Sequence, residues 1–443
     1  MKEWSVREFG AVGDGHANDT LAVQAAIDAC AQAGGGVVSL SAGKYLCSSI
    51  ILKSHVHLRL DSGAVLCEHP DMSLYPEDLM EKVWQGNELR CIFLYAKGQE
   101  DIHIFGDGMV LGNGTEDFGS WWGITEHPPV RIAMLLFDQC RDIVFHGVRF
   151  CYSDFWTLHL RQCEDVVIDR VTIKNNFRRL NTDGIDPDAC RNVFISNCHI
   201  SVGDDAIVAK SSVDGMTENM VVSNCVLESP CTAIKLGTDS VAGFRDIHFT
   251  NCIIRNSAVG IGIYMKDGGT AERISFSNIS IENWDIGHVK PVFPMFLDIE
   301  KRHMDSPIGI VRDIVFENIQ AVSANSAVFQ GMPERPIENL TFSNITLRVP
   351  FFRGFENRKK AVTGRRTTKD ERDFLFVRKP AYAVFAYVNG LTVQNFRVFL
   401  DPSFGESCDR YAVWLRDVSE PYIKGVFRDP PLPQGDVFWE DRT

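Results

Sequence analysis

The 443-residue sequence predicts an all-β fold in which the chain winds as a β-solenoid, and two observations support this. A short motif recurs: an Asn or Asp, then alternating apolar residues, usually a second Asn, and another apolar residue. Its sixth residue falls at positions 170, 197, 224, 251 and 278, which are 27 residues apart, and again at 318, 344 and 395. The segments between are rich in Val, Ile and Phe, with almost no helical periodicity after residue 35, so each repeat is expected to be one coil of parallel strands.

The recurring Asn side chains are expected to form an amide ladder in a turn, because equivalent positions of successive coils lie about 4.8 Å apart. They are Asn197, Asn224, Asn251, Asn278, Asn318, Asn344 and Asn395. Cys198, Cys225 and Cys252 follow the ladder as small buried residues. The 13 cysteines of the chain therefore indicate reduced thiols and not a disulfide framework.

The first 36 residues are predicted to cap the solenoid, because repeat arrays need a cover for their first coil. Asp19 offers an N-cap for a helix that begins near Thr20, and the glycines at 34–36 end it.

The remaining chain is predicted to continue as one domain, so that residues 1–443 form a single unit. Coils are expected over residues 37–425 and a C-terminal tail over 426–443. The charged stretch at about 353–375 indicates an exposed loop inserted between coils.

The net charge of -13 argues against nucleic acid or an acidic membrane surface as the main partner. No segment reaches the length and hydropathy of a transmembrane span. The N-terminal residues lack the apolar core of a signal peptide, so a cytoplasmic location is expected. Monomer and homo-oligomer both remain open.

Two acidic motifs fall in successive repeats, 181–186 (Asn-Thr-Asp-Gly-Ile-Asp) and 203–207 (Gly-Asp-Asp-Ala-Ile). Aligned by their isoleucines, they place Asp183 and Asp205 in neighbouring coils, with Asp204 beside Asp205. Three close carboxylates repel one another, so one should keep a proton, and a protonated acid beside an ionised base is what hydrolysis of a glycosidic bond requires. A turn-forming Asp is the ordinary alternative. Later coils carry Thr232 and Val259 at this position, which favours the functional interpretation.

Strand alternation then predicts an outward polar face next to these acids. It contains His159, Arg161, Asp186, Asp188, Lys210, Lys235, Tyr264 and Lys266. The lysines are expected either to bind substrate or to serve only solubility. Trp156 and the pair Trp121-Trp122 are candidate aromatic platforms for sugar rings, while Phe155 is expected to pack in the core.

The chain resembles glycoside hydrolase family 28, the polygalacturonase and rhamnogalacturonase group of the pectin-lyase-like right-handed parallel β-helices. The opening residues 9–15 and 34–38 are similar to those of many such β-helices, and the two acidic motifs are more specific to this family.

The resemblance implies a role for each acid. Asp204 would protonate the leaving oxygen, and Asp183 and Asp205 would activate the attacking water, giving inversion. Asn181 and the outward polar residues are expected to contact an oligosaccharide substrate. Because a cytoplasmic glycosidase would meet imported oligosaccharides and not cell-wall polymer, an exo mode on short fragments is expected. The resemblance implies no metal and no organic cofactor.

Two parts of the family pattern differ in this chain. Residues 229–237 contain no counterpart of the Gly-His-Gly turn, and residues 262–264 (Gly-Ile-Tyr) replace the Arg-Ile-Lys signature that binds a uronate carboxylate. The prediction is that Lys235, rather than Lys210 or Lys266, binds this carboxylate, or that the sugar is neutral, such as rhamnose.

Two other classes remain open at this point. A polysaccharide lyase would use a Lys or Arg base and Ca²⁺ on the acid cluster. A non-catalytic carbohydrate-binding solenoid would agree with the missing signatures.

Overall fold

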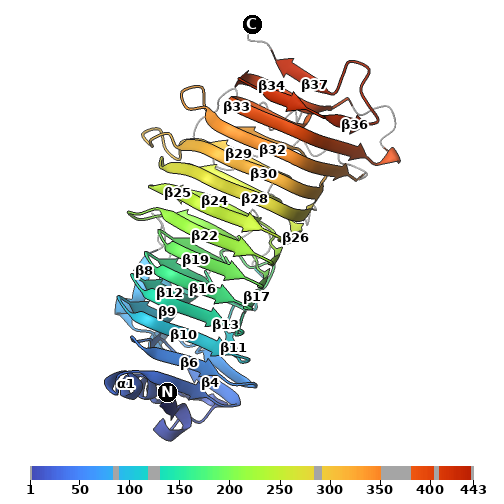
Figure 1. The fold of residues 1–443 in the computed structure, drawn as a ribbon. Coiled ribbons are helices and arrows are strands. Elements are labelled where there is room, and N and C mark those ends of the chain that lie inside the picture. Colours follow the sequence, from blue (N-terminus) through green and yellow to red (C-terminus); the bar gives the residue numbers. More distant parts are fainter. Residues whose placement is uncertain are drawn as a thin grey trace. The chain divides into compact units, whose positions relative to one another are not determined.

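The computed structural model describes residues 2–82, 89–117, 130–283, 292–350, 381–403 and 409–440. The chain forms two compact units, up to residue 208 and from residue 209 onward, and each is described by itself. Each is built from parallel strands wound as a right-handed parallel β-helix (Figure 1). This confirms the predicted fold class. The prediction of a single domain stays a prediction, and the stretch at 353–375 and Trp121-Trp122 lie outside the described residues.

The first unit contains three stacks of strands, here called A, B and C. Stack A consists of β1 (Glu3–Ser5), β3 (Gly36–Leu40), β6 (Val56–Leu60), β10 (Glu100–Gly106), β13 (Arg141–His146), β16 (Glu164–Asp169) and β19 (Arg191–Ser196). Stack B consists of β2 (Asp14–Asn18), β4 (Gly43–Cys47), β7 (Ala64–Glu68), β11 (Met109–Leu111), β14 (Arg149–Cys151), β17 (Thr172–Lys174) and β20 (His199–Ser201). Stack C consists of β5 (Ile50–Ile51), β9 (Leu89–Lys97), β12 (Val130–Asp138), β15 (Leu158–Arg161) and β18 (Ile185–Asp188).

Three short segments complete the connections of this unit, the 3₁₀ turns η1 (Val6–Phe9), η2 (Met72–Leu74) and η3 (Glu77–Leu79). The strand β8 (Met80–Lys82) runs antiparallel to β9. The strand β21 (Ile207–Ser211) contains the point where the first unit passes into the second.

The cap helix is α1 (Thr20–Gln32), as predicted. It buries Val23, Ala26, Ile27 and Cys30, whose spacing places them on one helical face. Asp19 occupies the N-cap position, but its carboxylate makes no capping bond to the helix and accepts from the backbone N–H groups of residues 12 and 13. The expected cap is therefore correct in position and wrong in its hydrogen bond.

The second unit repeats the three-stack plan with longer strands. These are β22 (Thr217–Ser223), β23 (Val226–Glu228), β24 (Thr232–Ser240), β25 (Gly243–Thr250), β26 (Ile253–Ser257), β27 (Val259–Met265), β28 (Thr270–Asn283), β29 (Phe293–Ile299), β30 (Ile310–Val322), β31 (Ala327–Gln330), β32 (Ile337–Val349), β33 (Ala381–Leu400), β34 (Tyr411–Ser419), β35 (Tyr422–Lys424), β36 (Phe427–Asp429) and β37 (Val437–Glu440). β28 pairs with both β25 and β26, so one strand continues around the corner between two stacks.

Strand pairing extends beyond residues 37–425 at both ends. Strand pairing already begins at β1, inside the expected cap. It also continues past residue 425, because β36 pairs with β33 and β37 pairs with β34. The sequence motif does not recur in the end coils, but backbone hydrogen bonds between strands form without it. The motif therefore does not indicate where pairing starts and stops.

The predicted amide ladder is present. In the second unit the side chains of Asn278, Asn318, Asn344 and Asn395 each donate to the preceding Asn of the ladder over 2.9–3.3 Å. All of the recurring Asn residues have φ between 51° and 56°, the left-handed region that Asn tolerates. Every cysteine that the structure describes is a buried free thiol, as predicted.

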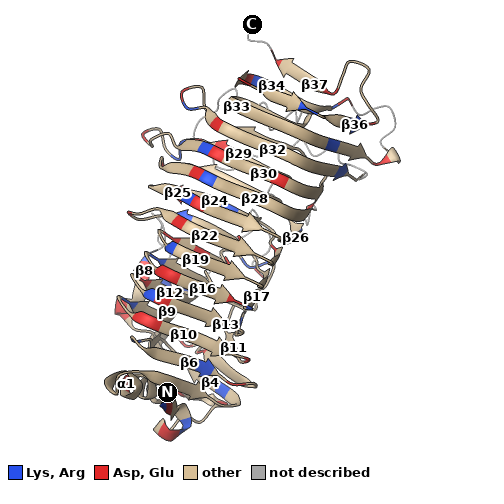
Figure 2. Cartoon of the chain, in the orientation of Figure 1, with Lys and Arg blue, Asp and Glu red and all other residues tan. Residues whose placement is uncertain are grey.

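Charges of alternating sign line one end of stack A in the first unit and one end of the stack formed by β22, β25, β28, β30 and β32 in the second (Figure 2). Paired in register they are Glu100, Arg141, Glu164 and Arg191 in the first unit. In the second unit they are Glu218, Arg245, Glu272, Arg312 and Glu338. Such cross-strand pairs favour this register over like-charge neighbours.

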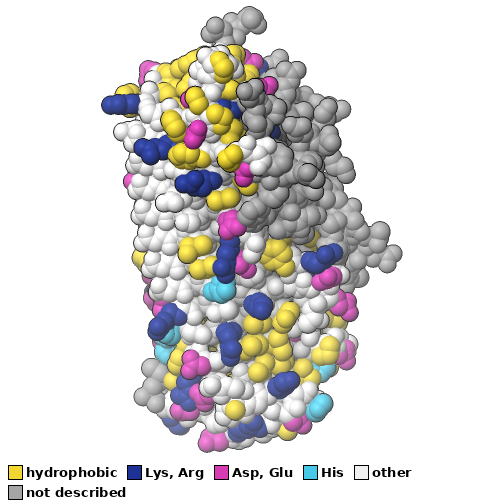
Figure 3. Space-filling model, turned by 90° about the vertical axis from the view of Figure 1, so that its right-hand side faces the viewer, with side chains coloured by type: hydrophobic (Ala, Val, Ile, Leu, Met, Phe, Trp, Pro, Cys, Tyr) yellow, Lys and Arg dark blue, Asp and Glu magenta, His cyan; other side chains and the backbone are white. Residues whose placement is uncertain are grey.

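The surface carries mixed side chains. On the face drawn in Figure 3, hydrophobic side chains are interspersed with acidic and basic ones. No helix among the described residues is long and apolar enough to cross a membrane.

Candidate active site

The two acidic motifs lie in register in the first unit. The backbone N–H of Gly184 donates to the carbonyl of Asp205 over 2.9 Å, and that of Ile185 donates to Ala206 over 3.0 Å. Asp183 and Asp205 therefore occupy equivalent positions of successive coils, which confirms the alignment predicted from the isoleucines. Asp204 directly precedes Asp205 in the same turn.

All three carboxylates are buried. The exposed fraction is 3% for Asp183, 3% for Asp204 and 2% for Asp205. The backbone N–H of Asn181 donates to Oδ2 of Asp204 over 3.0 Å, which fixes that carboxylate against the first motif. Burying charge is costly unless hydrogen bonds or counter-charges compensate, so such a concentration of acids indicates a functional site.

A buried arginine holds the segment that precedes Asp183. Arg131, only 2% exposed, donates from Nη1 to the carbonyl of Leu180 over 3.0 Å and from Nη2 to Oδ1 of Asn181 over 2.8 Å. Its guanidinium lies 4.4 Å from the centroid of the Phe155 ring, which supports it from one side. Asn181 is thus held by its side chain while its backbone holds Asp204.

The glycines of the motifs permit close packing. A Cβ at Gly203 would lie 2.0 Å from the carbonyl oxygen of Arg179, and one at Gly184 would lie 2.4 Å from that of Ala206. The N–H of Gly203 also donates to the hydroxyl of Thr182 over 2.9 Å. Any larger residue at either glycine would push the two acidic turns apart.

A buried ion pair between Arg179 and Asp154 involves the same segment. Nε of Arg179 donates to Oδ1 of Asp154 over 2.8 Å, and Oδ2 of Asp154 accepts from the N–H of Ile132. Glu68 lies near this pair and is 1% exposed. Burial, together with the charge of Asp154, raises the pKa of Glu68 well above its ordinary value.

A buried network joins His159 to residues far away in the sequence. Nδ1 of His159 lies 3.2 Å from Nη2 of Arg90, and its Nε2 lies 3.2 Å from Oδ2 of Asp188. Because Arg90 can only donate, Nδ1 is the acceptor, and the imidazole proton on Nε2 is donated to Asp188. Burial lowers the pKa of His159 to about 4, in agreement with a neutral ring.

Glu81 links two arginines at this end of the site. It accepts from Arg90 over 2.7 Å and from Arg161 over 2.9 Å. Arg161 also donates to Asp138 over 3.0 Å. Burial acts to raise the pKa of Glu81, but the two arginines outweigh it and lower that pKa to about 2.

The predicted outward face is buried where it was expected to be a surface. His159 is 2% exposed, Asp186 and Asp188 are fully buried, and Lys210 is 4% exposed. Strand alternation predicts on which face of a strand a side chain lies. It does not predict which other residues cover that face. Trp156, proposed as a platform, is also buried, stacked on Phe155 and edge-on to His159. Phe155 packs as expected.

The remaining predicted residues belong to the second unit and are half-buried. Nζ of Lys235 lies 5.5 Å from the centroid of the Tyr264 ring. Lys266 forms an ion pair with Glu300, so its charge is already compensated. Lys210, which is buried, also belongs to this unit, and its backbone carbonyl accepts from the hydroxyl of Thr217 over 2.6 Å.

Sequence reasoning missed Glu81, Arg90 and Arg131. A signal for the arginines existed, because each interrupts an otherwise apolar strand, and the two lie directly opposite each other in β9 and β12. An arginine in a buried strand requires a partner, and this could have marked both.

The sequence of this chain matches two protein families. The model of the family described as "Glycosyl hydrolases family 28" matches residues 76–361. The model described as "Rhamnogalacturonase A/epimerase, pectate lyase-like" matches residues 4–68. A probable polygalacturonase of Vitis vinifera is 28% identical over 383 residues, which cover 78% of this chain and 74% of the relative. Exopolygalacturonase B of Aspergillus niger is 27% identical over 297 residues, covering 60% of this chain and 66% of the relative.

A crystal structure shares the fold. A hyperthermoactive exopolygalacturonase from Thermotoga maritima superposes with a TM-score of 0.69 at 22% identity, covering 79% of this chain and 87% of the other. The family match defines this chain as a glycosidase, and the fold is the parallel β-helix. This chain belongs to glycosyl hydrolases family 28.

Proposed function

We propose that this glycosidase is an inverting, exo-acting hydrolase of pectin-derived oligosaccharides that contain galacturonate or rhamnose. The observation that carries the proposal is the pair of buried carboxylates, Asp183 and Asp205, at equivalent positions of successive coils, with the carboxylate of Asp204 hydrogen-bonded to the backbone of the first motif. Pectic substrates are supported by the names of the relatives, which are polygalacturonases.

In the proposed reaction Asp204 is the general acid. The N–H of Asn181 can only donate, so Oδ2 of Asp204 is held as an acceptor and the transferable proton belongs on Oδ1. This proton passes to the glycosidic oxygen as its bond to the anomeric carbon breaks. Neighbouring ionised carboxylates favour the protonated state of one member of the group, as the acid role requires.

Asp183 and Asp205 act in the same step on the attacking water. Their equivalent positions in neighbouring coils let both accept hydrogen bonds from one water, and one of them takes its proton as the oxygen bonds to the anomeric carbon. Attack from the face opposite the leaving group inverts the anomeric configuration. The exo mode is supported by the similarity to Exopolygalacturonase B, and Lys235 is the proposed partner of a uronate carboxylate.

The test is hydrolysis of purified pectic oligosaccharides with galacturonate or rhamnose at the non-reducing end. New reducing ends are expected, with short products from the earliest time point and inverted configuration by proton NMR. An unsaturated product absorbing in the ultraviolet would show elimination and contradict the proposal, as would a retained configuration. A rapid loss of polymer viscosity would contradict the exo mode alone.

A further inference from the structure

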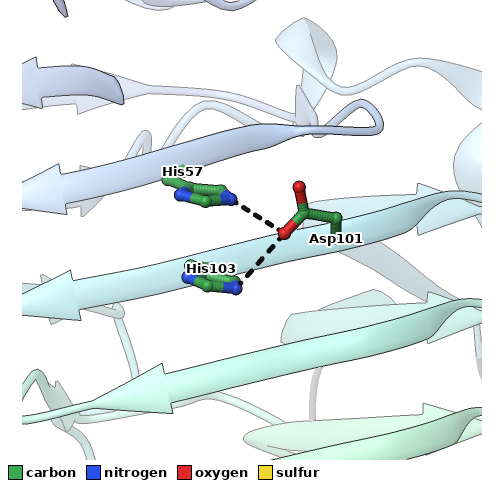
Figure 4. Close-up of side chains that lie close together, drawn as sticks. All are labelled: His57, Asp101 and His103. Carbon is green, nitrogen blue, oxygen red and sulfur yellow. Dashed lines mark hydrogen bonds and ion pairs between the residues drawn. The ribbon is translucent and has the colours of Figure 1, made fainter. Parts of the chain in front are cut away.

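We propose that His57, Asp101 and His103 form a binding site for one divalent transition-metal ion, with zinc as the best fit, on the outer face of stack A. None of these residues belongs to the acid site. They come from β6 and β10, which are paired so that His57 lies directly opposite His103 (Figure 4).

The geometry of the three groups matches a metal site. Oδ1 of Asp101 lies 2.9 Å from Nε2 of His57 and 3.4 Å from Nε2 of His103. Around a tetrahedral zinc ion with bonds of about 2.0–2.1 Å, two ligand atoms lie about 3.3 Å apart. Two imidazole nitrogens and one carboxylate oxygen thus already converge at nearly the required spacing.

The rings need a small rotation to share an ion. Their centroids are 3.8 Å apart and their planes differ by 6°, so the lone pairs run side by side. The torsion that turns an imidazole about its Cβ–Cγ bond is broad, and the His103 side chain is 31% exposed, which leaves room for this turn and for a water as fourth ligand.

A second observation separates this cluster from its surroundings. In the following coils the column that contains His57 and His103 continues with Val144, Val167 and Phe194. The imidazoles therefore occur in the two strands where Asp101 is within reach, and apolar residues take the position in the three strands that follow.

A third histidine, His55, orients the carboxylate of Asp101. Nδ1 of His55 lies 3.1 Å from its Oδ2, so the second carboxylate oxygen is occupied while Oδ1 faces the two rings. A hydrogen bond of this kind orients a metal-ligating carboxylate. The donor set of imidazole and carboxylate favours Zn²⁺, Ni²⁺ or Cu²⁺, whereas Ca²⁺ and Mg²⁺ prefer sites made of oxygen alone. A bound ion would join two coils and stabilise their pairing.

The experiment titrates zinc chloride into the full chain, prepared without a polyhistidine tag and stripped with EDTA that is then removed. Isothermal titration is expected to show one zinc ion per chain, and calcium chloride is expected to give no binding. His103→Ala and Asp101→Asn should each weaken zinc binding by about 10- to 100-fold. His199→Ala, at an exposed histidine of β20, is the matched control and should bind as the wild type does.

Two results would overturn the proposal. One is no zinc binding by the wild type up to about 1 mM. The other is unchanged affinity in Asp101→Asn, which preserves side-chain size and is checked for folding by circular dichroism. The cluster would then be a hydrogen-bonded group only. Asp204→Asn, which leaves this cluster intact, should bind zinc normally and so separates the proposed metal site from the proposed hydrolase.

Discussion

The backbone N–H of Asn181 donates a 3.0 Å hydrogen bond to Oδ2 of Asp204, while the side chain of Asn181 accepts from Arg131. One residue therefore transmits the position of a buried arginine to the proposed general acid. Substitution of either Asp204 or Arg131 is therefore expected to affect the same acid.

Asp204→Asn should remove turnover. The amide keeps the size of the side chain and cannot donate an acidic proton, so kcat is expected to fall by about 100- to 10,000-fold. The measurement is reducing-end release together with the melting temperature, which should stay near that of the wild type. Asp165→Asn, at an exposed aspartate of β16, is the control and should remain active. Retained activity in Asp204→Asn would remove the proposed mechanism.

Arg131→Lys should lower kcat with a smaller effect on KM. A lysine cannot donate to Leu180 and Asn181 at the same time in the same fork geometry, so Asn181 and with it Asp204 would shift. A displacement of about 1 Å costs on the order of 100-fold in rate. Arg141→Lys, on an exposed arginine paired with Glu100, is expected to behave as wild type. Equal kcat values in the two variants would exclude the positioning role.

His159→Gln should reduce the acid sensitivity of stability. In the folded state the pKa of His159 is lowered to about 4 from its ordinary 6.5. Between these values the unfolded chain binds the proton and the folded one does not, so stability falls as pH decreases from 6.5 to 4, by about 1.4 kcal/mol per pH unit. Melting temperatures across this range should fall less steeply in the variant, whereas His199→Gln should follow the wild type. If melting temperature changed with pH in the same way in the wild type and both variants, the lowered pKa of His159 would be contradicted.

Glu68→Gln should stabilise the protein at high pH. The pKa of Glu68 is raised by burial, so its contribution is complete below its ordinary pKa near 4.5 and is lost as pH rises toward the folded value. The uncharged amide has no such loss. Melting temperatures should agree near pH 4 and be higher for the variant at pH 8, with a difference of up to about 1.4 kcal/mol for each pH unit between the two pKa values. A variant that is less stable at pH 8 would show that Glu68 is ionised.

Lys235→Ala should discriminate between substrates. A hydrogen bond to a charged group contributes about 1.5–3 kcal/mol, so KM for a galacturonate-ended oligosaccharide should rise by about 10-fold or more. KM for a rhamnose-ended substrate should stay the same, because it has no terminal carboxylate. Lys174→Ala, at an exposed lysine of β17, is the control. No change for either substrate would assign the carboxylate to another residue.

The sequence by itself determined the coiled architecture and the alignment of the acids. A repeat of 27 residues places Asn224, Asn251 and Asn278 in neighbouring coils, so the start of the Asn ladder follows from counting along the chain. The register of Asp183 with Asp205, which are 22 residues apart, follows instead from aligning the isoleucines of the two motifs.

Only the tertiary structure decided what surrounds those positions. Arg90 hydrogen-bonds to His159, 69 residues further along the chain, and Glu81 accepts from Arg161, 80 residues further along. Neither sequence separation is a multiple of the 27-residue repeat. Hydrogen bonds between side chains from different coils depend on packing, and packing also converted an expected polar surface into a buried network. The sequence therefore fixes local period and register, while burial and ionisation of the site depend on contacts that form only when the coils stack.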